Sequence, residues 1–588
     1  MADSRRTEVD PITLAVVQGV LSATQRAMTS TMEMTGRSSV YAIARDYSNC
    51  LFDWEPRMIL QGEDLPTHLG SLIMATKAVA EFFGGDVRPG DVMFHNDPAY
   101  DGSHIVDMCM YKPIFADGEL LFWAVSKGHV IDAGGPVPGS YNRDAKEIYA
   151  EGLRIPPIKI VDRGVRREDV INLILTNVRS RRDQAGDMNA QLGAVTVAER
   201  RLTELATKYG VPVVRACVEQ LLDQAEAHMR SLIRERLPNG TYRASVIAED
   251  TGHGRGDQTL STEITVDDDE LTIRLEAPEQ LDYYTNSYRS NTLSGINAGL
   301  MMFAQVQPPY NEGLYRPVHI DFGPSGTMLN AAEPAPHVNC TGGPQETICD
   351  LIREALNQAD MSSASAGWNH TWCVNLAGEH PETGESWVEI LIASIVGGGG
   401  AVMGVADGWH SAGAQASMGG LKTGDSELVE LLAPIVLHRV EIAKDSAGPG
   451  TWRGGCGLTV EIEPIGEEMT VIAWGEGSKY PVLGVGDAHA KIVEPKLARG
   501  WHLRDGEVVR EVTENGSFVV RRGERYVTRS QGGGGAGDPF ERAPATVLHD
   551  VRHQKVSVEA ARVEYGVAVD PETLEIDEDA TRAARAAG

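Results

Sequence analysis

Two stretches near the N-terminus carry apolar residues at helical spacing. The first is residues 12–33, which follow Pro11, a residue suited to the first turn of a helix. The second is residues 71–83, which a pair of glycines ends. Residues 39–53 between them have the pattern of strands. The first part of the chain is therefore predicted to run helix, strands, helix.

Two apolar runs in the next part are separated by a short polar turn. Residues 111–115 and 120–125 are strand-like, and Asp117-Gly118 lies between them. Asp-Gly between apolar runs is the strongest short-range signal for a β-hairpin, because both turn positions need a positive φ. We therefore expect an antiparallel hairpin here.

The rest of the chain divides into helical and strand-like blocks. Residues 167–236 are mostly helical, and residues 241–280 alternate apolar with polar positions, which predicts an antiparallel sheet. Helices are expected near 292–305 and 344–358. Residues 385–530 have the pattern of strands and glycine turns, and a short acidic helical tail follows.

These blocks do not alternate as regular βαβ units, which favours the α+β class with several antiparallel sheets. A chain of 588 residues is also too long for one ordinary core. We expect a multi-domain, mixed α/β protein. Its predicted regions are an N-terminal hairpin region, a helical region, a mixed α/β region and a β-rich C-terminal region with an acidic helical tail, over residues 1–166, 167–240, 241–384 and 385–588.

The composition is that of an ordinary globular protein, with 42% hydrophobic and 23% charged residues. The formal net charge is −30, and the acidic residues are spread along the chain. This charge argues against nucleic acid and anionic membrane as partners, because both carry negative charge themselves. Beyond that, the charge indicates solubility only.

Cysteine usage and the N-terminus indicate the compartment. Seven cysteines are scattered without a CxxC motif, so neither a zinc ribbon nor a thioredoxin-type site is indicated. Reduced thiols in a cytoplasmic protein are the simpler interpretation. The N-terminus shows no apolar segment with a cleavage signal, and no apolar run reaches the ~18 residues that span a bilayer. A cytoplasmic location is expected.

The segment 95–135 gathers more chemistry than any other part of the chain. Three histidines and three carboxylates lie in it among glycines and apolar runs: His95, Asp97, His104, Asp107, His129 and Asp132. Imidazole and carboxylate groups together are typical ligands of divalent transition metals. The segment therefore predicts a metal site in the N-terminal region.

The hairpin register tests which of these side chains meet. With Asp117-Gly118 as a two-residue loop, Val106 lies opposite His129. His104 is then on the same face as His129 and diagonal to it, at roughly 7–8 Å, within reach of one shared ion. Strict alternation sends Asp107 to the other face, unless a bulge or an irregular start of the strand returns it. The alternative, that these side chains cap loops, stays open on the residues alone.

Glycine-rich segments are weaker candidates for a functional site. Residues 397–400 and 532–535 are runs of four glycines, but no GKS, GKT or GxGxxG motif accompanies them, so close backbone approach is the favoured interpretation. His253 and Asp257, in the sequence GHGRGD, are interpreted as a turn cluster. No Ser or Cys stands in a GxSxG elbow, so covalent catalysis has no support in the sequence.

Taken together, several motifs resemble the hydantoinase B family. Its members are the B-type subunits of ATP-dependent hydantoinases and oxoprolinases, related to acetone and acetophenone carboxylase subunits. The resemblance spans nearly the whole chain, and its motifs are specific in combination. They are Arg45-Asp46-Tyr47-Ser48, His68-Leu69-Gly70-Ser71, Asn96-Asp97-Pro98, Gly102-Ser103-His104 with Asp107, Gly128-His129 with Asp132, Glu151-Gly152-Leu153, Arg453-Gly454-Gly455-Cys456-Gly457, Gly532 to Gly535 and Tyr565-Gly566-Val567.

The resemblance implies a site and a partner. The site is one divalent transition metal, Mn, Fe or Zn, held by His104, Asp107 and His129. Asp97 and Asp132 are candidates for a general base or for groups that orient the ligands. The partner is an A-type subunit that binds ATP, in a hetero-oligomer such as A2B2. The lack of a nucleotide motif in this chain agrees with such a partner.

The leading functional hypothesis is the metal-bearing subunit of an ATP-dependent hydrolase that opens a cyclic amide, such as a hydantoin, oxoproline or lactam. The partner phosphorylates the amide oxygen, and the metal supplies the nucleophile, water or bicarbonate. The alternative is a subunit of an ATP-dependent ketone carboxylase of the acetone/acetophenone type. Val130 disfavours the carboxylase, because carboxylase-like relatives tend to show paired histidines where this chain has His129-Val130. A separate departure precedes the first predicted ligand, where many relatives carry a second Gly and a Thr and this chain has Asp101 and Ser103. A third hypothesis is a structural subunit with a vestigial metal.

Overall fold

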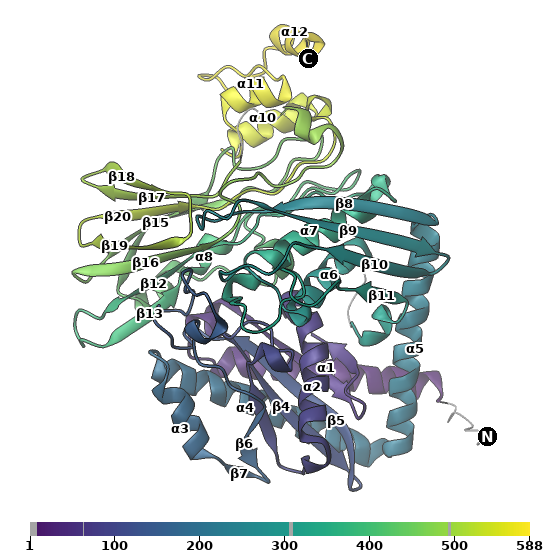
Figure 1. Ribbon diagram of the computed structural model, residues 1–588. Helices are drawn as coiled ribbons and strands as arrows, with labels where there is room; N and C mark the ends of the chain where they lie inside the picture. The colour runs from purple at the N-terminus through teal and green to yellow at the C-terminus, as the bar shows by residue number, and fades with distance from the viewer. Residues whose placement is uncertain (1–8, 63, 305–309, 492–495, 588) are drawn as a thin grey trace. The chain divides into compact units, whose positions relative to one another are not determined.

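A computed structural model describes residues 9–62, 64–304, 310–491 and 496–587. The chain forms two compact units, which we describe separately (Figure 1). Unit 1 comprises Met1–Ser245 and Leu260–Gln345, and unit 2 comprises Val246–Thr259 and Glu346–Gly588. Among the described residues, no helix is long and apolar enough to cross a bilayer.

Unit 1 is built around a seven-stranded antiparallel sheet in the order β2-β1-β5-β4-β3-β6-β7. The strands are β1 (Tyr47–Asp53), β2 (Met58–Gln61), β3 (Val92–His95), β4 (Asp107–Ala116), β5 (Glu119–His129), β6 (Ile158–Asp162) and β7 (Val165–Arg166). Every residue of β1 is buried, as is nearly all of β4 and β5. The central strands are therefore covered on both faces, so both faces can carry buried side chains.

Helices cover this sheet. Those of unit 1 are α1 (Pro11–Thr35), α2 (Leu69–Phe83), α3 (Glu168–Thr176), α4 (Arg181–Tyr209), α5 (Val211–Arg236) and α6 (Arg289–Ala304). Helices α1 and α4 pack on each other; α4 also contacts β4 and β5, and α1 contacts β1. Gln191 of α4 donates hydrogen bonds to the carbonyls of Met108 and Ser126, on neighbouring strands. The predicted helices over residues 12–33, 71–83 and 167–236 are confirmed.

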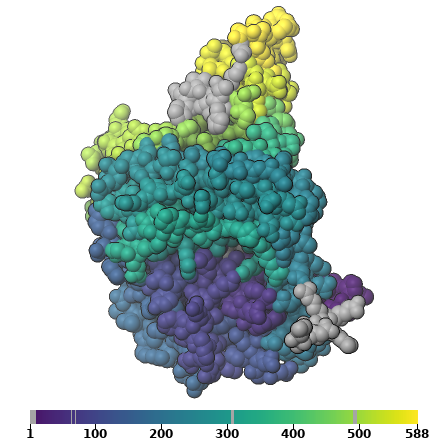
Figure 2. All heavy atoms as spheres, turned by 45° about the vertical axis from the view of Figure 1, so that its right-hand side comes forward, coloured from purple at the N-terminus to yellow at the C-terminus, as the bar shows by residue number. Residues whose placement is uncertain are grey.

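A second sheet of four strands has the order β11-β10-β9-β8. Its strands are β8 (Gly240–Ala248), β9 (Gln258–Asp267), β10 (Glu270–Glu276) and β11 (Val318–Asp321). In Figure 2 this sheet lies within the colour range from blue-green to teal that the bar gives for residues 240–321. Buried and exposed positions alternate along β9 and β10, as the sequence pattern predicts for a sheet with one solvent face.

Unit 2 holds two antiparallel sheets, in the orders β13-β12-β16-β19 and β14-β15-β20-β17-β18. Their strands are β12 (Trp372–Glu379), β13 (Ser386–Ile390), β14 (Ile435–Ile442), β15 (Leu458–Pro464), β16 (Glu468–Gly475), β17 (Arg499–Arg504), β18 (Glu507–Val512), β19 (Gly516–Arg521) and β20 (Arg525–Arg529). The helices are α7 (Pro344–Asn357), which begins two residues before the unit, α8 (Ile392–Ile395), α9 (Ser426–Leu432), α10 (Pro544–Arg552), α11 (Val558–Tyr565) and α12 (Glu578–Ala587).

Glycine backbone packs against glycine backbone in unit 2. We call residues 397–400, 454–455 and 532–535 the glycine layer. A Cβ atom on Gly398 would lie 2.0 Å from the Gly455 carbonyl oxygen, and one on Gly533 would lie 1.9 Å from that of Gly399. The segments are joined by hydrogen bonds, such as Gly455 N–H to the Gly399 carbonyl at 2.8 Å. The prediction of close backbone approach is confirmed, because no side chain fits here.

The expected α+β class with several antiparallel sheets is confirmed. One local prediction is wrong: residues 40–44 form a short π-helix and not a strand, and β1 begins only at Tyr47. Arg45 adopts a left-handed conformation with φ 58°, and the Asp46 N–H bonds back to the Val40 carbonyl. The apolar residues of this segment are buried in either conformation, so their pattern does not distinguish the two.

A candidate metal site in unit 1

The hairpin of β4 and β5 carries two of the three predicted ligands. Asp117 and Gly118 have φ values of 51° and 81°, the conformation that Asp-Gly predicts. An irregularity between Ile114 and Phe115, beside the turn, shifts the register by one residue.

This shift changes which residues face each other. Asp107 lies directly opposite His129, so the predicted pairing of Val106 with His129 is wrong. A one-residue shift moves a side chain to the other face, and here it brings Asp107 to the face of His129. The bulge that Asp107 requires therefore exists, but at the far end of the strand from where the sequence suggested it.

His104 approaches from the turn that leads into β4. Its Nδ1 lies 2.8 Å from the carbonyl oxygen of Val338, a group that can only accept a hydrogen bond. Nδ1 therefore carries the proton. In the neutral ring, Nε2 is then left with a lone pair, and it lies 2.9 Å from Asp107 Oδ1.

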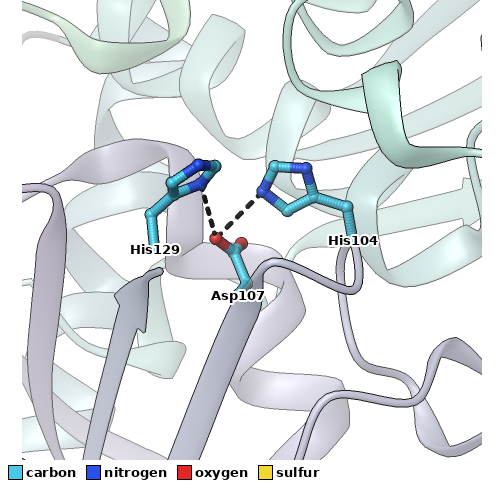
Figure 3. Close-up of side chains that lie close together, drawn as sticks. All are labelled: His104, Asp107 and His129. Atoms are coloured by element: carbon cyan, nitrogen blue, oxygen red, sulfur yellow. Dashed lines mark ion pairs between the residues drawn. The ribbon is translucent and has the colours of Figure 1, made fainter. Parts of the chain in front are cut away.

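The three side chains converge on one point (Figure 3). Asp107 Oδ1 lies 2.9 Å from His104 Nε2 and 3.3 Å from His129 Nδ1. One ligand atom from each residue lies within 4.8 Å of the others, and all three residues are buried. The structure thus brings together the three residues that the sequence nominated.

The second oxygen of Asp107 is held by donors. Lys127 Nζ lies 2.9 Å from Oδ2, and the Ser103 hydroxyl donates to it at 2.5 Å. Lys127 is only 1% exposed and also donates to the hydroxyls of Ser71 and Ser103. These contacts fix the carboxylate so that Oδ1 alone faces the two imidazoles.

The charges around the site act on its ionisable groups. Burial opposes ionisation of Asp107, but His104 and Lys127 outweigh it and hold the pKa of that carboxyl well below its usual value. Burial lowers the pKa of His104. Burial also acts against the charged form of His129, but its close contact with Asp107 and the charge of Asp46 raise its pKa overall. The site thus keeps an ionised carboxylate, as a metal ligand must be.

A metal ion fits this donor set. Asp107 Oδ1 is buried, and among the described residues no hydrogen bond of normal geometry satisfies it. It faces the bare Nε2 of His104, so two lone pairs meet unless a cation lies between them. Two imidazole nitrogens and one carboxylate oxygen suit Mn, Fe or Zn. His104, Asp107 and His129 are the residues that could hold it.

Three nearby residues escaped the sequence analysis as site members. His68 Nε2 lies 3.7 Å from both Asp46 Oδ1 and Asp107 Oδ2. Burial raises the pKa of Asp46 to about 6. Lys127 could have been found, because it lies two residues before His129 and shares its face of β5. For Asp46 and His68 only the family motifs gave a signal.

The other two predicted carboxylates, Asp97 and Asp132, form hydrogen bonds within and between loops. Asp97 accepts hydrogen bonds from the Ala99 N–H and from Arg154, at 3.0 and 2.7 Å. Asp132 accepts from the N–H groups of Gly134 and Gly139 and from the backbone and side chain of Arg179. Neither belongs to the group of ligand atoms around Asp107. His95, also in this segment, contacts the Tyr100 carbonyl through Nε2.

Comparison of the sequence with known proteins shows which family the chain belongs to. Residues 10–539 match the family described as hydantoinase B/oxoprolinase. The chain belongs to this family. It is 52% identical to the beta subunit of the caprolactamase of Pseudomonas jessenii, over 98% of this chain and 99% of that one. It is 28% identical to the B-type subunit of a putative D-/L-hydantoinase of Pseudomonas sp. strain NS671, over 98% of both chains.

Solved structures agree with this assignment. The ATP-dependent caprolactamase from Pseudomonas jessenii superposes with a TM-score of 0.92 and 50% identity, covering 99% of this chain and all of that one. A nucleotide-free acetone carboxylase superposes with a TM-score of 0.88 over 98% of this chain and 83% of that one. Its identity is 19%, so that likeness shows the fold alone. The family expected from the sequence motifs is confirmed.

Proposed function

We propose that this chain is the metal-bearing subunit of an ATP-dependent hydrolase that opens a cyclic amide, with lactams the favoured class. The observation that carries this is its 52% identity with the beta subunit of caprolactamase over almost the whole length of both proteins. The buried convergence of His104, Asp107 and His129 supports it, because it supplies a site for the chemistry.

His104, Asp107 and His129 are proposed to hold Mn, Fe or Zn. A bound ion of this kind supplies a Lewis acid and lowers the pKa of water. The chain's own residues prepare the site: Lys127 and the Ser103 hydroxyl turn one carboxylate oxygen of Asp107 away from the histidines and leave the other facing them. Burial of all three ligands keeps bulk water from competing with the substrate.

Asp97 and Asp132 were predicted as a general base or as orienting groups. Their hydrogen bonds favour the orienting role. Asp132 ties the loop that follows β5, and therefore the strand end that carries His129, to Arg179. Asp97 ties the turn before His104 to Arg154.

Activation of the amide is proposed to take place in a second, A-type subunit that binds ATP, within a hetero-oligomer. An unstrained amide resists attack by water, and phosphorylation of its oxygen creates a leaving group. The glycine layer of unit 2, the obvious candidate in this chain for a phosphate loop, is packed backbone to backbone, with carbonyl oxygens where a phosphate would lie. The name of the caprolactamase relative, a beta subunit, also supports a partner.

The alternative is a ketone carboxylase subunit, which the fold of acetone carboxylase favours. One experiment separates the two. The chain is purified with its A-type partner and incubated with ATP and a lactam, oxoproline, a hydantoin or acetone, with and without labelled bicarbonate. We expect ATP-dependent ring opening without incorporation of label. Label fixed into a product would overturn the hydrolase proposal.

The metal's role is tested in the same complex. His129→Ala removes one proposed ligand, while Lys127 still compensates the charge of Asp107. We expect loss of bound metal, measured by elemental analysis, and loss of at least ~100-fold in ring-opening rate. Full activity in a metal-free variant would instead make the chain a structural subunit.

A further inference from the structure

We propose that Glu151 is a positioning residue for the metal site: it fixes the tautomer and direction of His104 through the backbone of Val338. Glu151 touches none of the three ligands, and it comes from a different part of the chain. The proposal rests on the proposed metal site and adds to it a group outside the ligand set.

The first step is the bond between His104 and Val338. The imidazole can aim Nε2 at Asp107 only while Nδ1 keeps its proton and its direction, and the Val338 carbonyl enforces both at 2.8 Å. If this carbonyl turned away, the ring could flip or exchange its proton. The orientation of Val338 therefore decides whether His104 is a ligand.

The second step is the pair of hydrogen bonds by which Glu151 holds the backbone at Val338. Its Oε1 accepts hydrogen bonds from the backbone N–H groups of His337 and Val338, at 2.6 and 2.8 Å. Val338 begins a turn of only three residues, Val338–Cys340, so no long helix or strand holds its peptide groups. Glu151 is completely buried, which makes both charge-assisted bonds strong. These two bonds fix the start of the turn, and the next peptide, which carries the Val338 carbonyl, is held on its other side by the Asn339 N–H, which donates to the Tyr284 carbonyl at 3.1 Å.

The third step is the contact of His337, which lies between Glu151 and Ser103. His337 Nε2 lies 2.9 Å from the Ser103 carbonyl, so this nitrogen is the donor, and Nδ1 lies 3.1 Å from Glu151 Oε2. The Ser103 hydroxyl in turn donates to Asp107 Oδ2. One buried carboxylate thus reaches two proposed ligands by two routes: through the backbone of Val338 to His104, and through the backbone N–H of His337, whose side chain donates to Ser103, to Asp107.

A purely structural role for Glu151 predicts a different outcome. A carboxylate that only tied loops together would lower stability when removed, and metal affinity would change no more than for any other such carboxylate. Asp91 provides the matched control in the same unit. It is also completely buried, accepts hydrogen bonds from the N–H groups of Arg88 and Arg163, and lies 3.0 Å from Lys159. None of these contacts includes a ligand.

The test compares Glu151→Ala, Glu151→Gln and Asp91→Ala in the complete complex. Affinity for Mn²⁺ and for Zn²⁺ is measured by chelator competition, and thermal unfolding of the metal-free protein is followed in parallel. We expect Glu151→Ala to weaken metal binding by about 10–100-fold. Glu151→Gln keeps an oxygen acceptor for both N–H groups and should restore most of the affinity. Asp91→Ala should lower the unfolding temperature but leave the affinity within about twofold.

Equal metal affinity in Glu151→Ala and wild type would overturn the proposal, as would equal weakening by Glu151→Ala and Asp91→Ala. If Glu151→Ala does not fold, Glu151→Asp replaces it, because its shorter side chain draws the acceptor away from Val338. A wild-type complex that binds neither metal would refute the metal site itself. That result differs from tight wild-type binding that Glu151 does not affect, which refutes the positioning role alone.

Discussion

Each unit of this protein buries a cluster of histidine and carboxylate groups, and the two clusters are arranged in opposite ways. In unit 1, the nitrogens of His104 and His129 both point at one oxygen of Asp107. In unit 2, the two nitrogens of a single histidine, His370, point at two different acids, Asp350 at 2.7 Å and Glu476 at 3.8 Å.

The two clusters differ in the groups that neutralise the charge of the central carboxylate. Asp350 receives donors on both oxygens, Arg353 and Gln415 on one and His370 on the other. Burial opposes the charged form of His370, yet its hydrogen bond to Asp350 and the nearby Glu476 raise its pKa well above the usual value. Asp350 is therefore the centre of an ion-pair network in which cations of the chain itself face both of its oxygens. In unit 1, Oδ1 of Asp107 has two imidazole nitrogens in front of it and no hydrogen bond of normal geometry, so the same residue types form a candidate ligand set.

The sharpest test of this contrast replaces one acid in each cluster. Asp107→Asn removes the central ligand and leaves Lys127 as an unpaired buried cation, so we expect complete loss of bound metal and of activity. Stability should fall by about 3–5 kcal/mol. Asp350→Asn should also cost stability, because His370 loses the acid at 2.7 Å and Arg353 keeps only Glu354 as an ion-pair partner, but metal content should not change. Elemental analysis and denaturant unfolding decide; metal lost equally from both variants would contradict the contrast.

A second variant removes Lys127, the buried cation of the unit 1 cluster. Lys127→Met leaves Asp107 as a buried anion without a compensating charge when metal is absent. We expect the metal-free protein to lose about 3–5 kcal/mol of stability and the metal-loaded protein to lose much less. Unfolding temperatures with and without a chelator measure this difference. An equal loss in both forms would mean that Lys127 acts by packing alone.

The smallest effect concerns the pH dependence of unit 2. His370 has a raised pKa in the folded state, so its stabilising contribution is complete below the unfolded value of ~6.5 and is lost as pH rises towards the folded value. We expect the stability difference between wild type and His370→Gln to shrink by about 1.4 kcal/mol per pH unit above ~6.5. Unfolding measured between pH 6 and 9 tests this, and a constant difference would show that His370 is not charged.

The sequence predicted the parts of the site that local rules govern. Asp117-Gly118 favours positive φ values, so the hairpin was predictable, and with it the approach of His129, at the end of β5, to His104, in the turn before β4. The register was not predictable, because nothing in the residues around Ile114 and Phe115 marks an extra residue there. Asp107 was therefore placed on the wrong face by geometry and on the right one only by family motifs.

Groups that reach the site from distant segments left no local signal. Val338 and Glu151 lie 234 and 47 positions from His104; Val338 has no distinguishing chemistry, and for Glu151 only a family motif gave a signal. Lys127 is the intermediate case, since the two-residue period of a strand places it beside His129 once the hairpin is accepted. Long-range pairing is fixed by tertiary packing, which residue patterns along one segment do not record.

The glycine layer affects the heat capacity change on unfolding of unit 2. A core of apolar side chains raises the heat capacity when it becomes hydrated on unfolding, whereas exposed peptide groups lower it. Here the packed material is peptide, with carbonyl oxygens and N–H groups joined across neighbouring segments. Unfolding of this layer therefore contributes little or negative heat capacity. For the same buried area, the glycine layer therefore adds less curvature to the stability curve than apolar side chains do.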